Sequence, residues 1–125
     1  MKKCFLTEKG PRAIGPYSTA VCYGDTCYLS GIVPIDPATG KVIEGDAAAQ
    51  AEQVFSNMRL ILSELGLDMA NVLKTTVFLT DLNEFASVNA VYGKAFGENF
   101  PARSCVEVSK LPAGAQVEIE AVVAL

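Results

Sequence analysis

One apolar stripe, over residues 46–66, restricts the fold more than any other feature of the sequence. Apolar side chains recur there at helical spacing, between Asp46, a typical N-cap, and Gly66, a typical residue just past a helix end. We therefore predict a helix from Asp46 to Leu65 with the polar residues Gln50, Gln53, Asn57 and Glu64 off the stripe. A helix with one apolar face needs a second layer to cover it. The stripe comprises Ala47, Ala51, Val54, Phe55, Met58, Ile61, Leu62 and Leu65.

The rest of the chain supplies strands for that layer. A second helix is predicted after a capping box at 81–84, with Phe85, Val88, Tyr92 and Phe96 on one side and its end at Gly97. The order of elements is a pair of strands, a helix, a strand, a helix and a final pair of strands. This order predicts an α+β fold with two helices on one face of the sheet. The predicted strands are 4–6, 17–23, 26–30, 72–79, 103–108 and 116–123.

The other face of the predicted sheet carries a mixture of side chains. They include Thr76, Phe78, Arg103, Cys105 and Glu118, which cannot all face water. Half of the residues in this short chain are apolar, and such a composition favours packing against further copies. We expect one domain over residues 1–125, because no repeat, low-complexity tract or linker interrupts it, and a homo-oligomer in solution.

Charge and hydropathy exclude other classes of partner. The net charge is −4 and no run of lysine or arginine could neutralise a row of phosphates, so nucleic acid is a poor candidate. No apolar run reaches the roughly 18 residues of a membrane span, so no membrane association is expected. The apolar run at the amino terminus stops at Thr7, too early for a signal peptide. The expected location is the cytoplasm.

The cysteine and histidine content limits the kinds of catalytic and metal-binding site that the chain can form. Cys22 and Cys27 would face each other across a turn at Gly24-Asp25, close enough to bridge, but in a reducing cytosol we expect free thiols. No histidine is present, which removes Ser-His-Asp and Cys-His machinery and most transition-metal sites. We therefore expect no metal site, and any acid–base chemistry must fall to carboxylates, tyrosines, lysines or bound water.

The clearest candidate group for chemistry is Arg103, which opens a strand directly behind Phe100-Pro101. A guanidinium at the mouth of a strand can present a planar fork to a carboxylate. The turn at 111–114 is predicted to place the terminal strand, with Glu118, beside it. The alternative for Arg103 and Glu118 together is a cross-strand ion pair, which contributes about 0.2–1 kcal/mol. The alternative for Arg103 alone is an edge-strand arginine that is solvated.

Five further residues are weaker candidates. Ser30-Gly31 ends a strand where the missing Cβ lets a ligand approach the backbone. Asn89 would more commonly be a helix-surface residue, and Tyr17 a core residue. Cys105, without histidine, would more commonly be an inert packing residue.

Together these residues resemble the RidA/YjgF family of enamine and imine deaminases, over nearly the whole chain and in order. The resemblance is carried by 13–17 (Ala-Ile-Gly-Pro-Tyr), 29–31 (Leu-Ser-Gly), 71–82, Phe85, Asn89 with Tyr92, 100–104 (Phe-Pro-Ala-Arg-Ser) and 117–120 (Val-Glu-Ile-Glu). It implies a chorismate-mutase-like fold and a homotrimer with a central barrel and sites between subunits. It also implies hydrolysis of 2-aminoacrylate and related 2-imino acids to 2-keto acids and ammonia, without a metal or cofactor.

By the same resemblance, Arg103 would bind the substrate carboxylate and Glu118 would position or activate water. The pocket would be lined by Tyr17, Ser30, Gly31, Asn89 and Cys105. Ile32 departs from the family, in which many members carry glutamine, and would make this pocket more apolar. The alternative is a non-catalytic protein that binds 2-keto acids or acts as a chaperone-like regulatory trimer.

Overall fold

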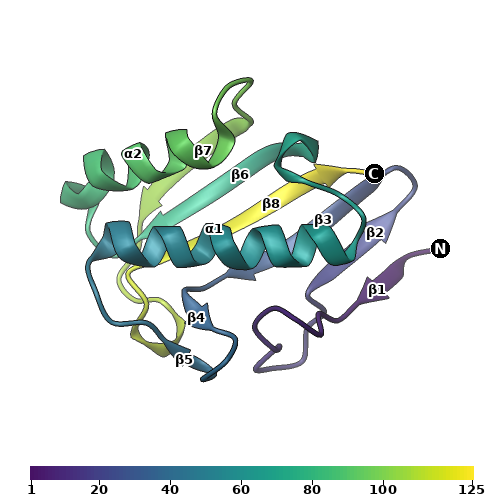
Figure 1. Cartoon of the computed structure of the whole chain (residues 1–125), viewed down its shortest axis with the longest axis horizontal. Helices are drawn as coiled ribbons and strands as arrows, with labels where there is room; N and C mark the ends of the chain where they lie inside the picture. Colours follow the sequence, from purple (N-terminus) through teal and green to yellow (C-terminus); the bar gives the residue numbers. More distant parts are fainter.

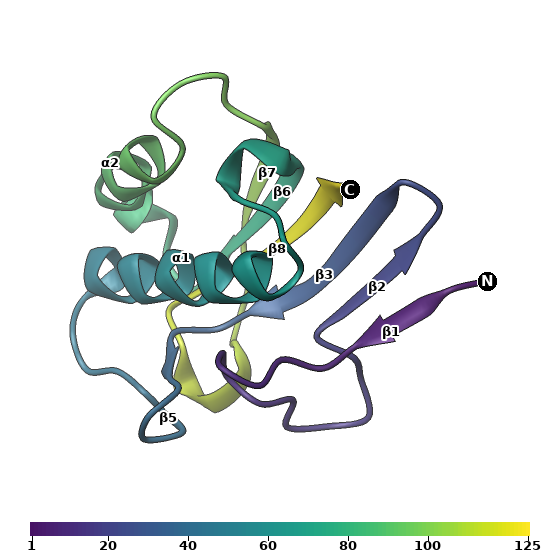
Figure 2. The ribbon, with the colours of Figure 1, turned by 45° about the vertical axis from the view of Figure 1, so that its right-hand side comes forward.

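The computed structural model describes all 125 residues as a six-stranded sheet with two helices packed on one face (Figures 1 and 2). The sheet order is β1-β2-β3-β8-β6-β7, and only β6 and β7 run parallel. Its strands are β1 Lys3–Phe5, β2 Ala20–Tyr23, β3 Thr26–Ile32, β6 Val72–Leu79, β7 Ala102–Glu107 and β8 Val117–Ala124. A small separate ladder pairs β4 Ile35–Asp36 with β5 Lys41–Val42. The predicted α+β class, with both helices on one face, is confirmed.

Helix α1 (Ala47–Glu64) forms where the apolar stripe predicts it, with the Asp46 side chain accepting a hydrogen bond from the backbone N–H of Ala49. The prediction that all of its amide side chains lie outside the core is wrong. Asn57 is fully buried and donates to the carbonyl oxygens of Val33 and Ile35. A buried amide is stable only when it is hydrogen-bonded, so Asn57 holds the β3–β4 connection against α1.

Helix α2 (Phe85–Phe96) follows a short 3₁₀ turn at Leu82–Glu84 and ends at Gly97, which has a φ of +74°. Asp81 caps the turn by accepting from the backbone N–H of Asn83. The reciprocal half of the predicted capping box is absent, because the Glu84 carboxylate instead accepts from the Ser87 hydroxyl. Two further 3₁₀ turns cover Met69–Asn71 and Pro112–Gly114.

Three predictions about the strands need correction. Strand β2 begins at Ala20 rather than at Tyr17, because the Tyr17 N–H closes a tight turn onto the Gly15 carbonyl after Pro16. β3 runs through Gly31 to Ile32. Cys22 and Cys27 do pair across the β2–β3 hairpin, but as a disulfide rather than as free thiols, since the register places them directly opposite each other.

The terminal strand does not lie beside the Arg103 strand. β8 is inserted between β3 and β6, and β6 separates it from β7. Four side chains of β8 are almost fully buried, which suits a strand with neighbours on both sides, whereas β7 has none buried and lies at the edge. The four are Val117, Ile119, Ala121 and Val123.

The sheet therefore has one covered face and one open face. The covered face packs against α1 and α2 around Phe55, Met58 and Leu62. The open face carries Tyr28, Phe78 and Val106 among polar side chains, and no element of the chain covers it (Figure 2). None of the helices is long and apolar enough to cross a lipid bilayer.

Candidate functional site in two halves

Arg103 lies on the covered side of the sheet, at the edge strand, and not on the open face as predicted. It pairs in parallel register with Thr75, a fully buried residue beneath the helices. Its guanidinium carbon lies 5.3 Å from the ring centre of Phe85 and 4.8 Å from that of Tyr92. Its Nη1 donates to the Asn89 side-chain oxygen at 2.6 Å. The guanidinium is exposed but held on three sides.

One edge of α2 supplies all three contacts. Phe85, Asn89 and Tyr92 are spaced i, i+4 and i+7, so they share one face of that helix. Tyr92 is fixed in turn by a buried 2.6 Å hydrogen bond between its hydroxyl and that of Thr75. The aromatic faces and the amide leave donor groups of the guanidinium free to bind an anion.

Arg103 and its three contact residues, which we call the first half-site, open into a hollow of about 420 Å³. Phe100-Pro101, which directs the chain into β7, forms one of its walls. The hollow is lined by Asn89, Tyr92, Gly93, Phe100, Pro101 and Arg103.

Cys105 lies two residues further along the same face of β7, opposite Val77, and packs against the core. Its placement on the open face was also wrong. Burial raises the pKa of its thiol, an effect that the charge of Arg103 reduces only in part. The thiol is thus poorly suited to act as a nucleophile, as the sequence suggested.

The second half-site lies on the open face, where β3 and β8 meet. The register between Leu29 and Ile32 is interrupted, so that Ser30 and Gly31 together face Glu120. This is a β-bulge, which re-aims the strand locally. A Cβ atom on Gly31 would lie only 2.7 Å from the carboxyl carbon of Glu118, so the Glu118 side chain occupies the space above this glycine.

A hollow of about 340 Å³ brings the remaining predicted residues together. Tyr17 lies at its rim, with its hydroxyl accepting from the Ile14 backbone N–H at 3.3 Å. Ser30 is fixed by donating its hydroxyl to the Ser18 carbonyl at 2.7 Å. The lining residues are Ile14, Tyr17, Leu29, Ser30, Gly31, Val33, Pro112, Glu118 and Glu120.

Two causes raise the pKa of Glu118: burial first, and then the nearby negative charge of Glu120. A carboxyl group with a raised pKa is a stronger base when ionised and exchanges protons nearer neutral pH. No cluster of three or more cysteine or carboxylate side chains is arranged to hold a metal ion. The second half-site therefore offers a proton-exchanging carboxyl group beside the bulged backbone of Ser30 and Gly31.

Several residues of the two half-sites were not predicted from the sequence as site residues. They are Ile14, Pro112 and Glu120 in the second half-site, and Phe85 and Tyr92, which with Asn89 form the clamp on Arg103 in the first. The clamp could have been found, because Phe85, Asn89 and Tyr92 already show helical spacing. Ile14 reaches the hollow from an irregular loop and Pro112 from a short 3₁₀ turn, and no sequence period indicates where such segments lie.

The fold and the two half-sites define a small α+β protein with a clamped arginine in one open hollow and a carboxyl group of raised pKa in the other. Comparison with known proteins gives the family. The family profile described as endoribonuclease L-PSP matches residues 7–125. The chain belongs to this family, which is the RidA/YjgF family.

Named relatives cover the chain almost completely. The Salmonella typhimurium protein named 2-iminobutanoate/2-iminopropanoate deaminase is 49% identical over 125 residues, covering 98% of this chain and 97% of its own. The human protein of the same name is 46% identical over 122 residues, covering 98% of this chain and 89% of its own. The structure of RidA from the Antarctic bacterium Psychrobacter superposes with a TM-score of 0.94 at 43% identity, covering 98% of this chain and 99% of that one.

Proposed function

We propose that the protein is an enamine and imine deaminase. It would hydrolyse 2-aminoacrylate and related 2-imino acids to 2-keto acids and ammonia, without a metal or cofactor. One observation carries the proposal: a clamped, unpaired guanidinium and a carboxyl group of raised pKa each line an open hollow, one on either side of the sheet. The two deaminases named above, each at least 46% identical, support the reaction class.

The two half-sites would be joined between subunits. Arg103 and Glu118 cannot meet within one chain, since they point to opposite sides of the sheet and β6 lies between their strands. An uncovered sheet face with large apolar side chains is typical of an interface between subunits. A homotrimer, as the family resemblance implies, would bring the first half-site of one chain to the second half-site of its neighbour.

In the joined site, Arg103 would bind the substrate carboxylate with a bidentate contact and so place the imine carbon near Glu118. Ionised Glu118 would take a proton from water as the water oxygen bonds to C2. The electron pair of the C=N bond would move to nitrogen, which takes that proton from Glu118 and so restores the carboxylate and gives a neutral carbinolamine. Glu118 would then take the hydroxyl proton of the carbinolamine and pass it to the amino nitrogen. The electron pair left on oxygen would form the C=O bond as the C–N bond breaks, and ammonia would leave the 2-keto acid.

An enamine such as 2-aminoacrylate would first become the imine by accepting a proton at C3 and losing one from nitrogen. Glu118 is suited to that exchange because its pKa is raised toward neutral pH. A single acid–base group contributes about 10²–10⁴-fold, which suffices for a substrate already unstable in water.

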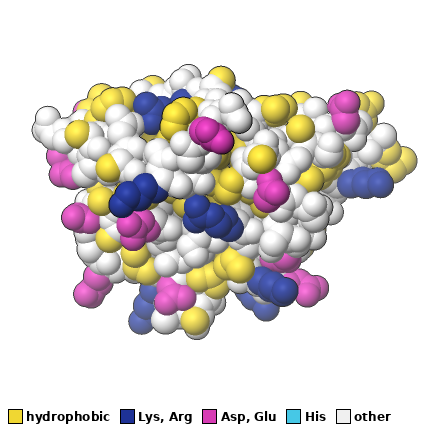
Figure 3. All heavy atoms as spheres, turned by 45° about the horizontal axis from the view of Figure 1, so that its top comes forward, with side chains coloured by type: hydrophobic (Ala, Val, Ile, Leu, Met, Phe, Trp, Pro, Cys, Tyr) yellow, Lys and Arg dark blue, Asp and Glu magenta, His cyan; other side chains and the backbone are white.

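Charge distribution argues against nucleic acid as the substrate, despite the word endoribonuclease in the family description. On the face shown in Figure 3, lysine and arginine side chains are separated by acidic and uncharged ones. With a net charge of −4, such a surface offers no continuous path for a phosphate backbone.

The test is a coupled assay in which a pyridoxal-phosphate lyase generates 2-aminoacrylate from serine and the decay of the intermediate is followed. We expect the protein to accelerate its decay, and Arg103→Ala and Glu118→Gln each to remove most of the acceleration. Binding of 2-keto acids without acceleration would show instead a sensor or regulatory protein.

Mixed oligomers test the joining of subunits. Arg103→Ala and Glu118→Gln chains, unfolded and refolded together in equal amounts, should regain about one quarter of wild-type activity, because about one interface in four receives both intact halves. Each variant refolded alone is the control. No gain on mixing would contradict a site formed between chains.

A further inference from the structure

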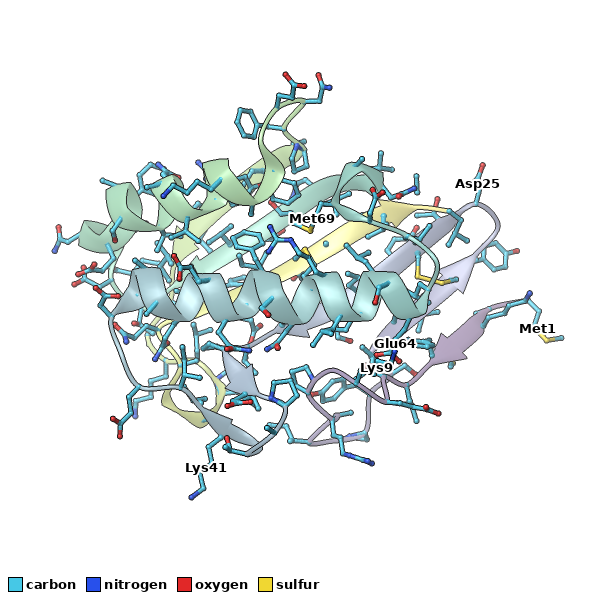
Figure 4. The ribbon with its side chains drawn as sticks, viewed as in Figure 1. Met1, Lys9, Asp25, Lys41, Glu64 and Met69 are labelled. Carbon is cyan, nitrogen blue, oxygen red and sulfur yellow. A yellow bond between two sulfur atoms is a disulfide. The ribbon has the colours of Figure 1, made fainter.

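The last residue of α1, Glu64, is placed where a helix disfavours it. A carboxylate at the carboxyl end opposes the helix dipole, and no basic residue in the last turn offsets it. Its contacts lie outside the helix, in the amino-terminal loop. The carboxylate accepts from the Thr7 hydroxyl and from the backbone N–H groups of Glu8 and Lys9, at 3.0 and 3.1 Å. Figure 4 shows Glu64 and Lys9 close together beneath the end of α1.

Thr7 extends this contact into the buried part of the loop. Its side chain is only 6% exposed. Its hydroxyl donates to Glu64 and accepts from the Gly10 N–H at 2.9 Å, while its own N–H donates to the Thr19 hydroxyl at 3.0 Å. The two ends of the segment 7–19 are thereby tied to each other through Thr7, which is itself held by the Glu64 carboxylate.

Thr19 connects the network to the second half-site. Its carbonyl accepts from the Ser30 N–H at 2.9 Å, and Ser30 in turn donates its hydroxyl to Ser18. Ser30 is the first residue of the bulge that lies beneath Glu118. A continuous series of hydrogen bonds therefore runs from the end of α1 to the site, through Glu64, Thr7, Thr19 and Ser30.

The segment has few other constraints. Residues 6–19 form no helix or strand, and Tyr17 at its far end is 45% exposed. Close packing restrains it at Gly10, where a Cβ atom would lie 2.9 Å from the Thr7 hydroxyl oxygen and 3.2 Å from Ile61. A loop held at so few points moves readily when one of them is lost.

We propose that Glu64 is a positioning residue that, through Thr7 and Thr19, fixes residues 7–19 and with them Tyr17 and Ser30 at the candidate site. The effect on catalysis rests on the proposed function, whereas the effect on the loop does not. Glu64 contacts no residue of the hollow directly, so its influence is exerted only through the loop.

The test begins with Glu64→Gln, which keeps the size of the side chain but puts an amide NH₂ group in place of one accepting oxygen. Both oxygens are needed, because Oε1 accepts from the Thr7 hydroxyl and the Lys9 N–H and Oε2 accepts from the Glu8 N–H. Limited trypsin digestion of the native protein, read by mass at Lys9 and Arg12, should be about 3–10-fold faster than in the wild type. Glu52→Gln, an exposed carboxyl group on the same helix, should leave that rate unchanged.

Deaminase kinetics give the second readout. We expect kcat/KM to fall several-fold for Glu64→Gln, mainly through KM. The loss should be non-additive with Tyr17→Phe, which acts through the same loop, and additive with Asn89→Ala in the other half-site. Additivity with Tyr17→Phe, or an unchanged trypsin rate, would overturn the proposal.

A second pair of variants keeps the test decisive if Glu64→Gln fails to fold. Thr7→Val removes the connecting hydroxyl at constant size, and Thr7→Ser retains it. Faster cleavage in the valine variant alone supports the proposal, and equal rates in the two overturn it. If the wild type shows no deaminase activity, the proposed function fails, and the trypsin rates still decide whether Glu64 fixes the loop.

Discussion

Arg103 and Glu118 lie on opposite faces of the same sheet, with β6 between their strands. Arg103 points toward α2 and is held by Phe85 and Asn89, whereas Glu118 lies over Gly31 on the open face. The interpretation of this pair as a cross-strand ion pair is therefore excluded. Each group instead lines a separate hollow with its charge uncompensated by the other. This is the arrangement expected if a ligand and a second chain complete the site.

The clamp on Arg103 depends on a buried pair of hydroxyl groups. Thr75→Val would leave the Tyr92 hydroxyl without its partner and should lower the free energy of unfolding by about 1–3 kcal/mol. The double variant Thr75→Val with Tyr92→Phe removes both hydroxyls and should be destabilised by less than the sum of the single variants. Urea unfolding of the four proteins measures the coupling, and additive effects would contradict it.

Asn89 is predicted to act on the orientation of Arg103. Asn89→Ala removes the 2.6 Å contact with the guanidinium while leaving both aromatic rings. A hydrogen bond to a charged group contributes about 1.5–3 kcal/mol, so we expect KM for an imino acid to rise roughly 10–100-fold with little change in unfolding midpoint. The exposed Asn83 provides the matched control, Asn83→Ala, for which KM should not change.

Gly31 is predicted to tolerate no side chain. In Gly31→Ala the new methyl group would meet the Glu118 carboxyl group and displace it from the hollow. We expect a large loss of kcat with a modest loss of stability of about 1–3 kcal/mol. Gly24→Ala tests strain alone, because that glycine has a φ of +62° but open space around it. Equal kcat for wild type and Gly31→Ala would contradict the assigned geometry.

The sequence predicted the elements with strong periods. The α1 stripe and the run of β-branched residues over 72–79 correspond closely to the observed α1 and β6, because burial on one face imposes a period on the sequence. Helix placement on a single sheet face also followed from the order of elements.

Pairing partners were harder to predict than elements. The turn at 111–114 suggested that β8 pairs with β7, but hairpin formation is only a local preference. The four buried residues on one face of β8 favour a central position for this strand in the sheet, whereas β7, which has no buried residue, forms the sheet edge. Because period-two alternation does not say which face is covered, Arg103 and Cys105 were placed on the wrong side.

The Cys22–Cys27 disulfide can be tested by counting reactive thiols. Unfolded protein under non-reducing conditions should show two reactive thiols, Cys4 and Cys105, and four after reduction. The native protein should show fast reaction at the exposed Cys4 and slow reaction at Cys105, whose pKa is raised by burial. Four reactive thiols without reduction would contradict the disulfide.

The acidic limb of the pH–rate profile is predicted to depend on Glu120. Burial and the charge of Glu120 hold the pKa of Glu118 above the ordinary 4.5. Glu118 acts as a base when ionised, so activity should rise with pH through that raised pKa. Glu120→Gln removes the effect of the neighbouring charge on this pKa and leaves the effect of burial. The limb should therefore move to lower pH but stay above the value for a free carboxyl group.

The raised pKa of Glu118 also makes the stability of the fold depend on pH, in the direction opposite to that of activity. Because its pKa is raised on folding, Glu118 binds more protons in the folded than in the unfolded state at pH values between the two pKa values. Its contribution to the free energy of unfolding must fall as pH rises from 4.5 through the folded-state pKa, and Glu120→Gln should make that fall smaller. Profiles of kcat/KM and urea midpoints against pH measure both effects, with Glu44→Gln as an exposed control outside the hollow. An acidic limb that stays in place in Glu120→Gln would show that Glu120 does not act on Glu118, and the second of the two causes of its raised pKa would have to be withdrawn.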